Sequence, residues 1–334
     1  MTLLYDARTV QAHATPELAL ESVRRALTAE SNDLAALSPR HDLRTSTGFL
    51  RVMPGYLDGV MGVKVMALVN GLGTRYVLLM LEIETGELLA IFDAEELTRT
   101  RTAAMTAVAA AAMTVDCGTS LGVIGSGFEA VGHLRMFAAM WPLDQAFVFS
   151  PNAERRERFA KTLSSELDIR IEPVSTPEAA LRGQSCALLA TKSAEPVVES
   201  TMFEPGCAVL SIGSTRLDLR ELDVATFRRA AAVVVDHAGQ VQAESGDVVA
   251  ALDAQAITLD QLITVPELPI HDGFASAERD LLVFKSVGTI IQDLALARAL
   301  HNEASCRSEA MPIGELGQLK QFAAEVDFTP SSAI

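Results

Sequence analysis

A short glycine-containing stretch near the middle of the chain has the spacing of a phosphate-binding turn. Residues 121–131 read LGVIGSGFEAV, in which an apolar run ends in a Gly-Ser-Gly turn and a helical pattern follows. Gly125 suits the tight turn, Gly127 leaves room for a pyrophosphate beside the backbone, and Ala130 lets the helix pack close to its strand. The free N–H groups at the start of that helix would face the phosphates. The stretch predicts a dinucleotide site, with an ordinary strand-to-helix packing turn as the alternative.

The residues after the next predicted strand bear on which dinucleotide binds. This strand ends in Ser150, where a fold that binds NAD usually places an acid on the ribose 2′-hydroxyl. Ser150 and Asn152 can donate hydrogen bonds to a 2′-phosphate, and Arg155 or Arg156 can form an ion pair with it. We therefore expect NADP(H). NAD(H) stays open, because Glu154 can also reach the ribose and both arginines could simply be solvated on the following helix.

The first third of the chain has the pattern of a helix followed by hairpins. Thr15 and Pro16 start a predicted helix over 15–30, and residues 32–39 have the composition of a loop. Short strands are predicted at 48–54, 62–69, 76–83 and 88–92. Consecutive hairpins of this kind predict an antiparallel sheet, and a helix over 98–115 closes this part.

From Ser120 onward, predicted strands alternate with helices. The strands fall at 121–125, 146–150, 169–174, 186–191, 207–212 and 231–236, and the clearest helices between them cover 128–141, 153–167 and 177–181. This alternation predicts an α/β fold with a doubly wound parallel sheet. A strand at 281–285 precedes a long helix that Ser286 is expected to cap and that runs to about residue 304.

Composition and charge exclude several classes of function. The 334 residues are 49% hydrophobic, which is enough for two domains with buried cores. A formal net charge of −16 disfavours nucleic acid and anionic membrane surfaces as partners, although local arginines and lysines can still bind a small anion. The six histidines show no paired spacing, so we expect no metal centre.

The cysteines and the N-terminal segment favour a cytoplasmic protein. Cys117, Cys186, Cys207 and Cys306 are widely spaced without a CxxC motif, which indicates reduced thiols. Residues 1–11 lack the basic and apolar regions of a secretory signal. The apolar segment 103–113 is short and rich in alanine, so it predicts a packed helix rather than a membrane span.

These motifs together resemble those of the ornithine cyclodeaminase/mu-crystallin family, and the match covers nearly the whole chain. The matching segments occur in the family's order: Met53-Pro54, Gly62-Val63-Lys64, Thr85-Gly86, Leu97-Thr98 with Arg101-Thr102-Ala103-Ala104, Gly125-Ser126-Gly127, Ala190-Thr191, Ile212-Gly213-Ser214 with Glu221-Leu222-Asp223, Val234-Val235-Asp236 and Phe284-Lys285-Ser286-Val287-Gly288. The resemblance implies a homodimer. It also implies a discontinuous α+β substrate and dimerisation domain, residues 1–117 plus 289–334, around a Rossmann NAD(P)-binding domain over 118–288.

The resemblance also implies which cations hold the substrate. Lys64 matches a lysine on a strand of apolar neighbours, where a desolvated ammonium can bind a carboxylate or exchange a proton near neutral pH. Arg101, expected at a helix start, matches an arginine between the substrate carboxylate and the cofactor. Arg40 matches a second carboxylate-binding arginine, a role that Arg44 could take instead. A solvated surface position is the alternative for each of these side chains.

A further set of positions matches family residues that touch the dinucleotide. These are Thr74, Thr102, Phe128, Glu129, Thr191, Ser211 and Ser286, and the match at Thr74 needs a one-residue gap. Lys285 and Ser286 are expected to open a helix beside the nicotinamide. Hydroxyl groups at such places more often bond to the backbone as caps, so that is their alternative role.

One departure from the family pattern decides the expected reaction. Cyclodeaminases of this family carry a catalytic aspartate, followed by Cys-Pro-Gly-Lys, after the fifth strand, whereas this chain has Thr215 at the aspartate position. A threonine cannot be the acid-base that ring closure with loss of ammonia requires, unless a loop shift brings Asp218 into place. A hydride donor, carboxylate-binding cations and Lys64 suit reduction of a C=N bond beside a carboxylate.

The sequence therefore predicts an NAD(P)H-dependent imine reductase that converts a small 2-imino acid to an L-amino acid, with Lys64, Arg101 and Thr215 at the reaction site. Δ1-Pyrroline-2-carboxylate is one candidate substrate, and Arg216 and Arg220 leave room for the dicarboxylic iminosuccinate. Three alternatives stay open: an ornithine cyclodeaminase, an alanine-dehydrogenase-like reductive aminase, and a non-enzymatic binding protein for small molecules.

Overall fold

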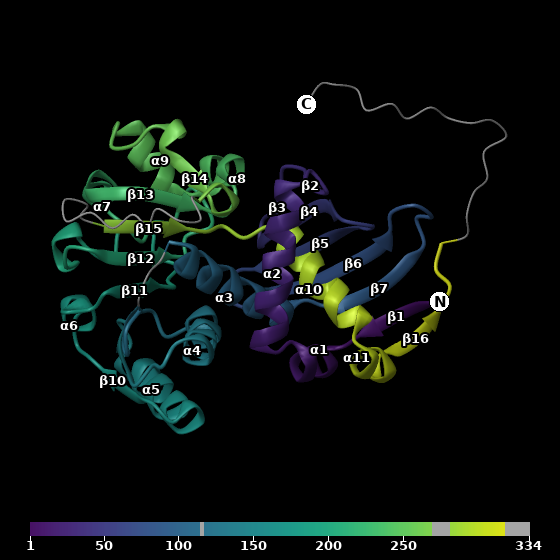
Figure 1. Cartoon of the computed structure of the whole chain (residues 1–334), viewed down its shortest axis with the longest axis horizontal. Coiled ribbons are helices and arrows are strands. Elements are labelled where there is room, and N and C mark those ends of the chain that lie inside the picture. Colours follow the sequence, from purple (N-terminus) through teal and green to yellow (C-terminus); the bar gives the residue numbers. More distant parts are fainter. Residues whose placement is uncertain (114–116, 269–280, 318–334) are drawn as a thin grey trace.

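The computed structural model describes residues 1–113, 117–268 and 281–317, which form two lobes side by side (Figure 1). Each lobe contains an eight-stranded sheet. One sheet is mixed and the other is entirely parallel, so the predicted α/β fold class with a doubly wound sheet is confirmed. The proposed domain boundaries stay a prediction.

The parallel sheet has the strand order β10-β9-β8-β11-β12-β15-β13-β14. Its strands are β8 (Ser120–Ile124), β9 (Gln145–Phe149), β10 (Arg170–Pro173), β11 (Cys186–Leu189), β12 (Cys207–Ser211), β13 (Ala230–Val235), β14 (Leu262–Thr264) and β15 (Leu281–Lys285). The order reverses between β8 and β11. Crevices at the carboxyl ends of strands beside such a reversal are where open α/β sheets bind ligands.

The mixed sheet has the order β16-β1-β7-β6-β5-β4-β2, with β3 also paired to β4. Its strands are β1 (Thr2–Tyr5), β2 (Ala35–Leu37), β3 (His41–Thr45), β4 (Gly48–Leu57), β5 (Val60–Val69), β6 (Gly73–Glu82), β7 (Leu88–Asp93) and β16 (Met311–Gly314). The predicted hairpins from β4 to β7 are present. These hairpins pair antiparallel as predicted. The sheet is mixed because β1, which was not predicted, pairs with β7 in parallel, and β2 lies within the segment predicted as a loop.

Helices cover the sheets and join the lobes. The α-helices are α1 (Ala7–His13), α2 (Pro16–Ser31), α3 (Glu95–Ala112), α4 (Phe128–Met140), α5 (Ala153–Leu167), α6 (Pro177–Leu181), α7 (Val224–Arg229), α8 (Ala238–Glu244), α9 (Gly246–Asp253), α10 (Ile290–Asn302) and α11 (Ala304–Glu309), and short 3₁₀ turns are η1 (Ser200–Met202), η2 (Leu259–Gln261) and η3 (Val265–Glu267). Thr15 caps α2 as predicted. None of the helices in the three described ranges is long and apolar enough to cross a membrane.

Two helix starts differ from the predictions. Helix α3 begins at Glu95, three residues before the predicted start, so Arg101 lies in its second turn rather than at its beginning; residues 114 and 115 of the predicted helix lie outside the described residues. Helix α10 begins at Ile290, and its cap is Thr289, whose hydroxyl accepts from the Gln292 N–H. Ser286 is therefore not a helix cap, and Lys285 is the last residue of β15.

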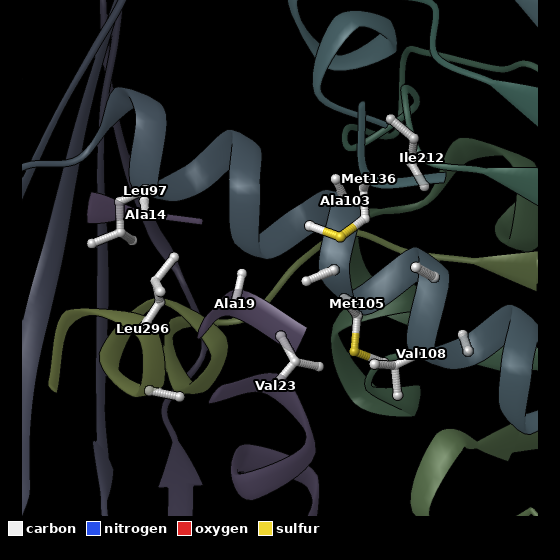
Figure 2. Packing of buried hydrophobic residues seen from close by; sticks show 14 of the residues in the cluster. Ala14, Ala19, Val23, Leu97, Ala103, Met105, Val108, Met136, Ile212 and Leu296 are labelled. Carbon is white, nitrogen blue, oxygen red and sulfur yellow. The ribbon is translucent and has the colours of Figure 1, made fainter. Parts of the chain in front are cut away.

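Helix α3 carries the hydrophobic core from one lobe into the other. Leu97 at its first turn packs near Ala14 and Leu296, whereas Met105 and Val108 lie toward Met136 in the second lobe (Figure 2). Alanine is frequent in α3, and small side chains let the neighbouring helices approach closely. The helix therefore holds Arg101 at the junction of the two lobes. The four cysteines are buried free thiols, as predicted.

Candidate functional site

The glycine turn between β8 and α4 has the geometry that a phosphate group needs. Gly125 adopts a φ of 118°, and a side chain there would also collide with the carbonyl oxygen of Ala190. Gly127 is the N-cap of α4, it makes no side-chain hydrogen bond to the first turn, and the space beside its Cα is open. The first N–H groups of this helix therefore lie uncapped at the carboxyl end of β8, and these residues fit a bound pyrophosphate.

A polar rim stands beside this turn, where β9 ends. The Ser126 and Ser150 hydroxyl oxygens are 2.8 Å apart. Asn152 caps α5 by accepting from the Arg155 N–H at 2.8 Å, which leaves its side-chain NH₂ group to donate. Arg155 is exposed, and Arg156 donates to the Ser150 carbonyl at 2.9 Å. The rim offers hydroxyl, amide and guanidinium donors together, which is the donor set that a ribose 2′-phosphate requires.

Three predicted cofactor positions belong to a buried network at the carboxyl ends of β11, β12 and β15. Glu221 accepts from the backbone N–H and hydroxyl of Thr191 at 2.6 and 2.9 Å, and from the Ser211 hydroxyl at 2.7 Å. Lys285 donates to Ser211 at 2.9 Å and lies 2.9 Å from an Asp247 carboxylate oxygen. Ser211 and Lys285 have no exposed surface, so their side chains tie the strand ends together.

The other predicted cofactor positions differ in whether their side chains already form hydrogen bonds within the protein. Ser286 donates to Asp236 at 2.7 Å, and Thr102 donates at 2.7 Å to a backbone carbonyl one turn earlier in α3. The Thr102 bond is the backbone bond expected as the alternative for such hydroxyl groups, whereas Ser286 bonds to a carboxylate and caps no helix. Thr74 on β6 is half-buried and Phe128 is exposed. Contact between any of these side chains and a dinucleotide stays a prediction.

Lys64 and Arg101, far apart in the sequence, converge on one buried carboxylate. Lys64 Nζ lies 2.6 Å from one oxygen of Asp293, and Arg101 Nε donates to the other oxygen at 2.7 Å. Arg101 also donates to Gln292 at 2.9 Å. The exposed fractions of the three charged side chains are 2%, 4% and 0% for Lys64, Arg101 and Asp293. One acid thus pairs with two cations, and the group has a net positive charge whenever Lys64 is protonated.

Local structure explains why these side chains meet. Lys64 is on the face of β5 that it shares with its register partners Met53 and Leu78, both of which are buried. Asp293 lies in the first turn of α10, where a carboxylate is stabilised by the positive end of the helix dipole. Arg101 lies against Gly288, which has a φ of 72°, and any side chain at that position would collide with the guanidinium.

Burial and charge set the protonation of this group. Burial lowers the pKa of Lys64 to about 7, although the adjacent Asp293 opposes the shift. Burial alone would raise the pKa of Asp293, but Arg101 and Lys64 outweigh it and hold that pKa below its usual value. Asp293 is therefore ionised at neutral pH, whereas Lys64 can gain or lose a proton there.

Arg40 reaches the same region from the segment between β2 and β3. Its guanidinium lies 2.9 Å from Glu244, donates to the Val287 carbonyl at 2.9 Å, and also contacts the carbonyl of Gly288, the residue against which Arg101 packs. Arg40 Nε is buried and has no hydrogen-bond partner within the described ranges. Arg44, the other candidate, is exposed on β3, whereas the Arg40 side chain is buried against Gly288, the residue that Arg101 also contacts.

The loop that carries Thr215 directs no acid toward Lys64, Arg101 or Arg40. Thr215 is half-buried in the loop after β12. Asp218, the substitute acid, is paired through both carboxylate oxygens with Arg216, and its side chain is 65% exposed. The Arg216 guanidinium lowers the pKa of Asp218, so this carboxyl group stays ionised at the surface.

Several residues that complete the site were not predicted from the sequence. Asp293, Gln292 and Glu244 hold the three cations, yet none belongs to a motif. The available signal for Asp293 was an acid inside the apolar run IIQDLALA, where a charge needs a buried partner. Across the described residues, no group of three or more His, Cys, Asp or Glu side chains is arranged to hold a metal ion.

Comparisons with known proteins show what this chain is similar to. The chain is 28% identical to ketimine reductase mu-crystallin from Mus musculus over 266 residues, 77% of this chain and 81% of the relative. It is 29% identical to an alanine dehydrogenase from Archaeoglobus fulgidus over 320 residues, 91% and 95% of the two chains. The structure of Thermococcus litoralis Δ1-pyrroline-2-carboxylate reductase in complex with NADH and L-proline superimposes with a TM-score of 0.87 at 27% identity, covering 93% of this chain and 100% of that one. A family model matches residues 2–308, and the chain belongs to the ornithine cyclodeaminase/mu-crystallin family.

Proposed function

We propose that this protein reduces a small 2-imino acid to the L-amino acid with NADPH or NADH. The observation that carries the proposal is the buried group of Lys64, Arg101 and Arg40. These three cations are paired with two acids, Asp293 and Glu244, and Arg40 Nε has no hydrogen-bond partner within the described residues. A buried donor without an acceptor costs about 1–3 kcal/mol. A substrate carboxylate supplies both the missing acceptor and the missing negative charge.

The glycine turn and the rim beside it support a nicotinamide dinucleotide as the cofactor. A relative of known structure is described as bound to NADH and L-proline, and its fold covers nearly all of this chain. We infer a preference for NADP(H), because the rim has Ser150, Asn152 and Arg155 and no acid at the end of β9. NAD(H) is the second choice.

Each side chain of the site has a separate role in the proposed reaction. Arg101 is held in one orientation by Asp293 and Gln292, so its remaining N–H groups can bind the substrate carboxylate without further ordering. Lys64 adds positive charge beside that carboxylate. Because its pKa is about 7, its amine can also exchange a proton with the bound substrate or with water. A bound reduced nicotinamide supplies the hydride that the imine carbon accepts.

A cyclodeaminase is the second candidate, and the structure favours it less. That reaction needs an additional acid-base, and the position that would carry it is Thr215. Asp218 is exposed and held by Arg216, so it is a poor replacement. Release of ammonia from ornithine without net formation of NADH would support the cyclodeaminase, whereas tight binding of NADPH without any turnover would support a binding protein.

We also propose a homodimer that forms on the outer face of the mixed sheet. Leu43 and Leu50 are register partners on adjacent strands, and Val77 lies on the same face, opposite the face that carries Lys64. Leu43 is 66% exposed and Val77 is 42% exposed. Exposed apolar side chains grouped on one sheet face are typical of an interaction surface. Light scattering should give twice the chain mass, and Leu43→Arg should reduce it to the monomer mass.

The decisive assay follows the nicotinamide absorbance band while candidate substrates are added. Δ1-Pyrroline-2-carboxylate, iminosuccinate, and pyruvate with ammonia are each tested with NADPH and with NADH. Lys64→Met should lower kcat/KM about 10- to 100-fold, because a hydrogen bond to a charged group contributes about 1.5–3 kcal/mol. Lys161→Met, a change at an exposed lysine on α5, is the matched control and should behave as wild type. Failure of the wild-type protein to oxidise either dinucleotide with any of these substrates would refute the proposal.

A further inference from the structure

One acid of this site has no role in the interactions described above. Glu129 is the second residue of α4, directly after the glycine turn. Its Oε2 is buried and has no hydrogen-bond partner anywhere in the described part of the chain. The backbone around it is fixed, because His133 bonds to the Glu129 carbonyl at 2.7 Å through one ring nitrogen and to Thr106 at 3.0 Å through the other. A buried carboxyl oxygen held in place without a partner indicates that a ligand completes its hydrogen bonding.

The charged groups that act on Glu129 include two cations of the carboxylate site and two outside it. Arg101 acts on it most strongly, followed by Lys192 after β11, Arg99 on α3 and Lys64 on β5. Tyr76 on β6 is affected by charges of both signs: its ring centroid is 5.7 Å from Lys64 Nζ, and burial together with Glu129 raises the pKa of its phenol. The neighbouring ring of His133 is buried, and burial lowers its pKa to about 4, so it is neutral.

Glu129 and Arg40 together leave a complementary pair of unused groups around Lys64 and Arg101. Among the residues that the structure describes, Arg40 Nε is a donor without an acceptor, and Glu129 Oε2 is a carboxyl oxygen without a partner. A 2-imino acid has a carboxylate, which accepts, next to a nitrogen that must gain a proton. Its two functional groups therefore match the two unused groups of the protein.

We propose that Glu129 is the catalytic residue that donates the proton to the substrate nitrogen. This inference rests on the proposed imine reduction and adds the proton donor to it. In the step, the imine carbon accepts a hydride from the reduced nicotinamide, the C=N π bond breaks, and its electron pair takes the carboxyl proton of Glu129. The products are the amine, the oxidised nicotinamide and the Glu129 carboxylate, which regains a proton from solvent.

Charge balance explains how the proton is present when it is needed. Burial raises the pKa of Glu129, and the nearby cations oppose this shift. Arrival of a substrate carboxylate neutralises part of that positive charge, so it raises the pKa of Glu129 further and favours the protonated acid. Lys64 suits this task less well, because its ammonium is held between Asp293 at 2.6 Å and the Thr98 hydroxyl at 3.3 Å.

The test compares Glu129→Gln with wild type, because glutamine keeps the shape and cannot donate an acidic proton. Glu178→Gln is the matched control, since Glu178 also lies in the first turn of a helix but is exposed away from the site. At saturating imine and NADPH, wild-type kcat should fall as the pH rises through the pKa of Glu129. The variant should have a kcat lower by about 10²-fold and should lack that alkaline decline.

A binding measurement gives a second readout that does not need turnover. Calorimetric titration of the complex with oxidised dinucleotide uses pyrrole-2-carboxylate, a planar carboxylate whose ring nitrogen does not titrate near neutral pH. Repeating the titration in buffers of different ionisation enthalpy gives the number of protons that the complex takes up on binding. Wild type and Glu178→Gln should take up more protons on binding than Glu129→Gln, in which only Lys64 remains to gain a proton.

The outcomes separate this inference from the proposed function. If wild type reduces an imino acid and Glu129→Gln keeps the wild-type pH profile and proton uptake, the proton donor is another group and the inference is overturned. A lower kcat with an unchanged pH profile overturns it as well, since Glu129 would then only position other groups. If wild type neither reduces an imino acid nor binds the carboxylate, the proposed function fails and this inference fails with it.

Discussion

Replacement of Asp293 by asparagine is the perturbation whose effect on stability follows most directly from the structure. Asp293 has no exposed side-chain surface and lies 2.6 and 2.7 Å from two cations whose side chains are 2% and 4% exposed. Removing one partner of a buried ion pair costs about 3–5 kcal/mol, because the remaining charge is left without compensation. We expect Asp293→Asn to lower the free energy of unfolding by about that amount.

The loss should depend on pH in a defined direction. Without the carboxylate, the pKa of Lys64 falls further below 7, so the folded variant keeps this amine neutral while the unfolded chain protonates it. Each pH unit below the wild-type pKa therefore adds up to about 1.4 kcal/mol to the difference between variant and wild type. Adding Lys64→Met to Asp293→Asn removes the free energy that deprotonation of this amine costs on folding, so the double variant should be more stable than Asp293→Asn alone.

Urea unfolding of the dinucleotide-free protein measures these quantities. Glu166→Gln is the control, since it breaks the exposed pair between Glu166 and Arg135 and should cost less than about 1 kcal/mol. Equal small losses for Asp293→Asn and Glu166→Gln would refute the reasoning. Simple addition of the Asp293→Asn and Lys64→Met losses would refute it too, because it would mean that the two side chains do not interact.

Three further predictions concern Lys64, Gly127 and Arg155. Because the folded-state pKa of Lys64 is about 7 against 10.5 in the unfolded chain, this group should make the protein more stable as the pH rises from about 7 to 10.5, a slope that Lys64→Met should lose in thermal melts. Gly127→Ala fills open space at a φ of −91°, so it should leave the melting temperature of the dinucleotide-free protein unchanged while weakening NADPH binding by about tenfold or more, as measured by fluorescence titration. Arg155→Ala should raise the KM for NADPH about tenfold without changing the KM for NADH, and equal changes for both would contradict a 2′-phosphate contact at Arg155.

The regular part of the fold could be predicted from local patterns. Strand and helix periods after Ser120 identified the parallel sheet, because each βα unit is short and its signals are local. Strand β3 was missed because all five of its residues are exposed, so it shows no apolar alternation. Strand β1 pairs with β7, more than eighty residues away, and nothing in the sequence near β1 encodes a parallel neighbour.

The site could be predicted only in part, for a similar reason. Lys64 and Arg101 were recognised through motifs, but the acid between them comes from α10 near the other end of the chain. Lys285 and Ser211 lie at the edge of the sheet where a cofactor is expected to bind. Their side chains nevertheless point inward to a network around Glu221, which only the packed structure reveals. Sequence spacing identifies the backbone positions at a sheet edge, but packing decides where each side chain points.

The central claim is that a nicotinamide dinucleotide and a carboxylated imine meet at Lys64 and Arg101. The most direct measurement is oxidation of NADPH or NADH by the wild-type protein with Δ1-pyrroline-2-carboxylate or iminosuccinate, with L-amino acid quantified as the product. The account predicts one amino acid formed per dinucleotide oxidised, and a large loss of both in Arg101→Met. No oxidation with either dinucleotide, or oxidation that persists unchanged in Arg101→Met, would contradict it.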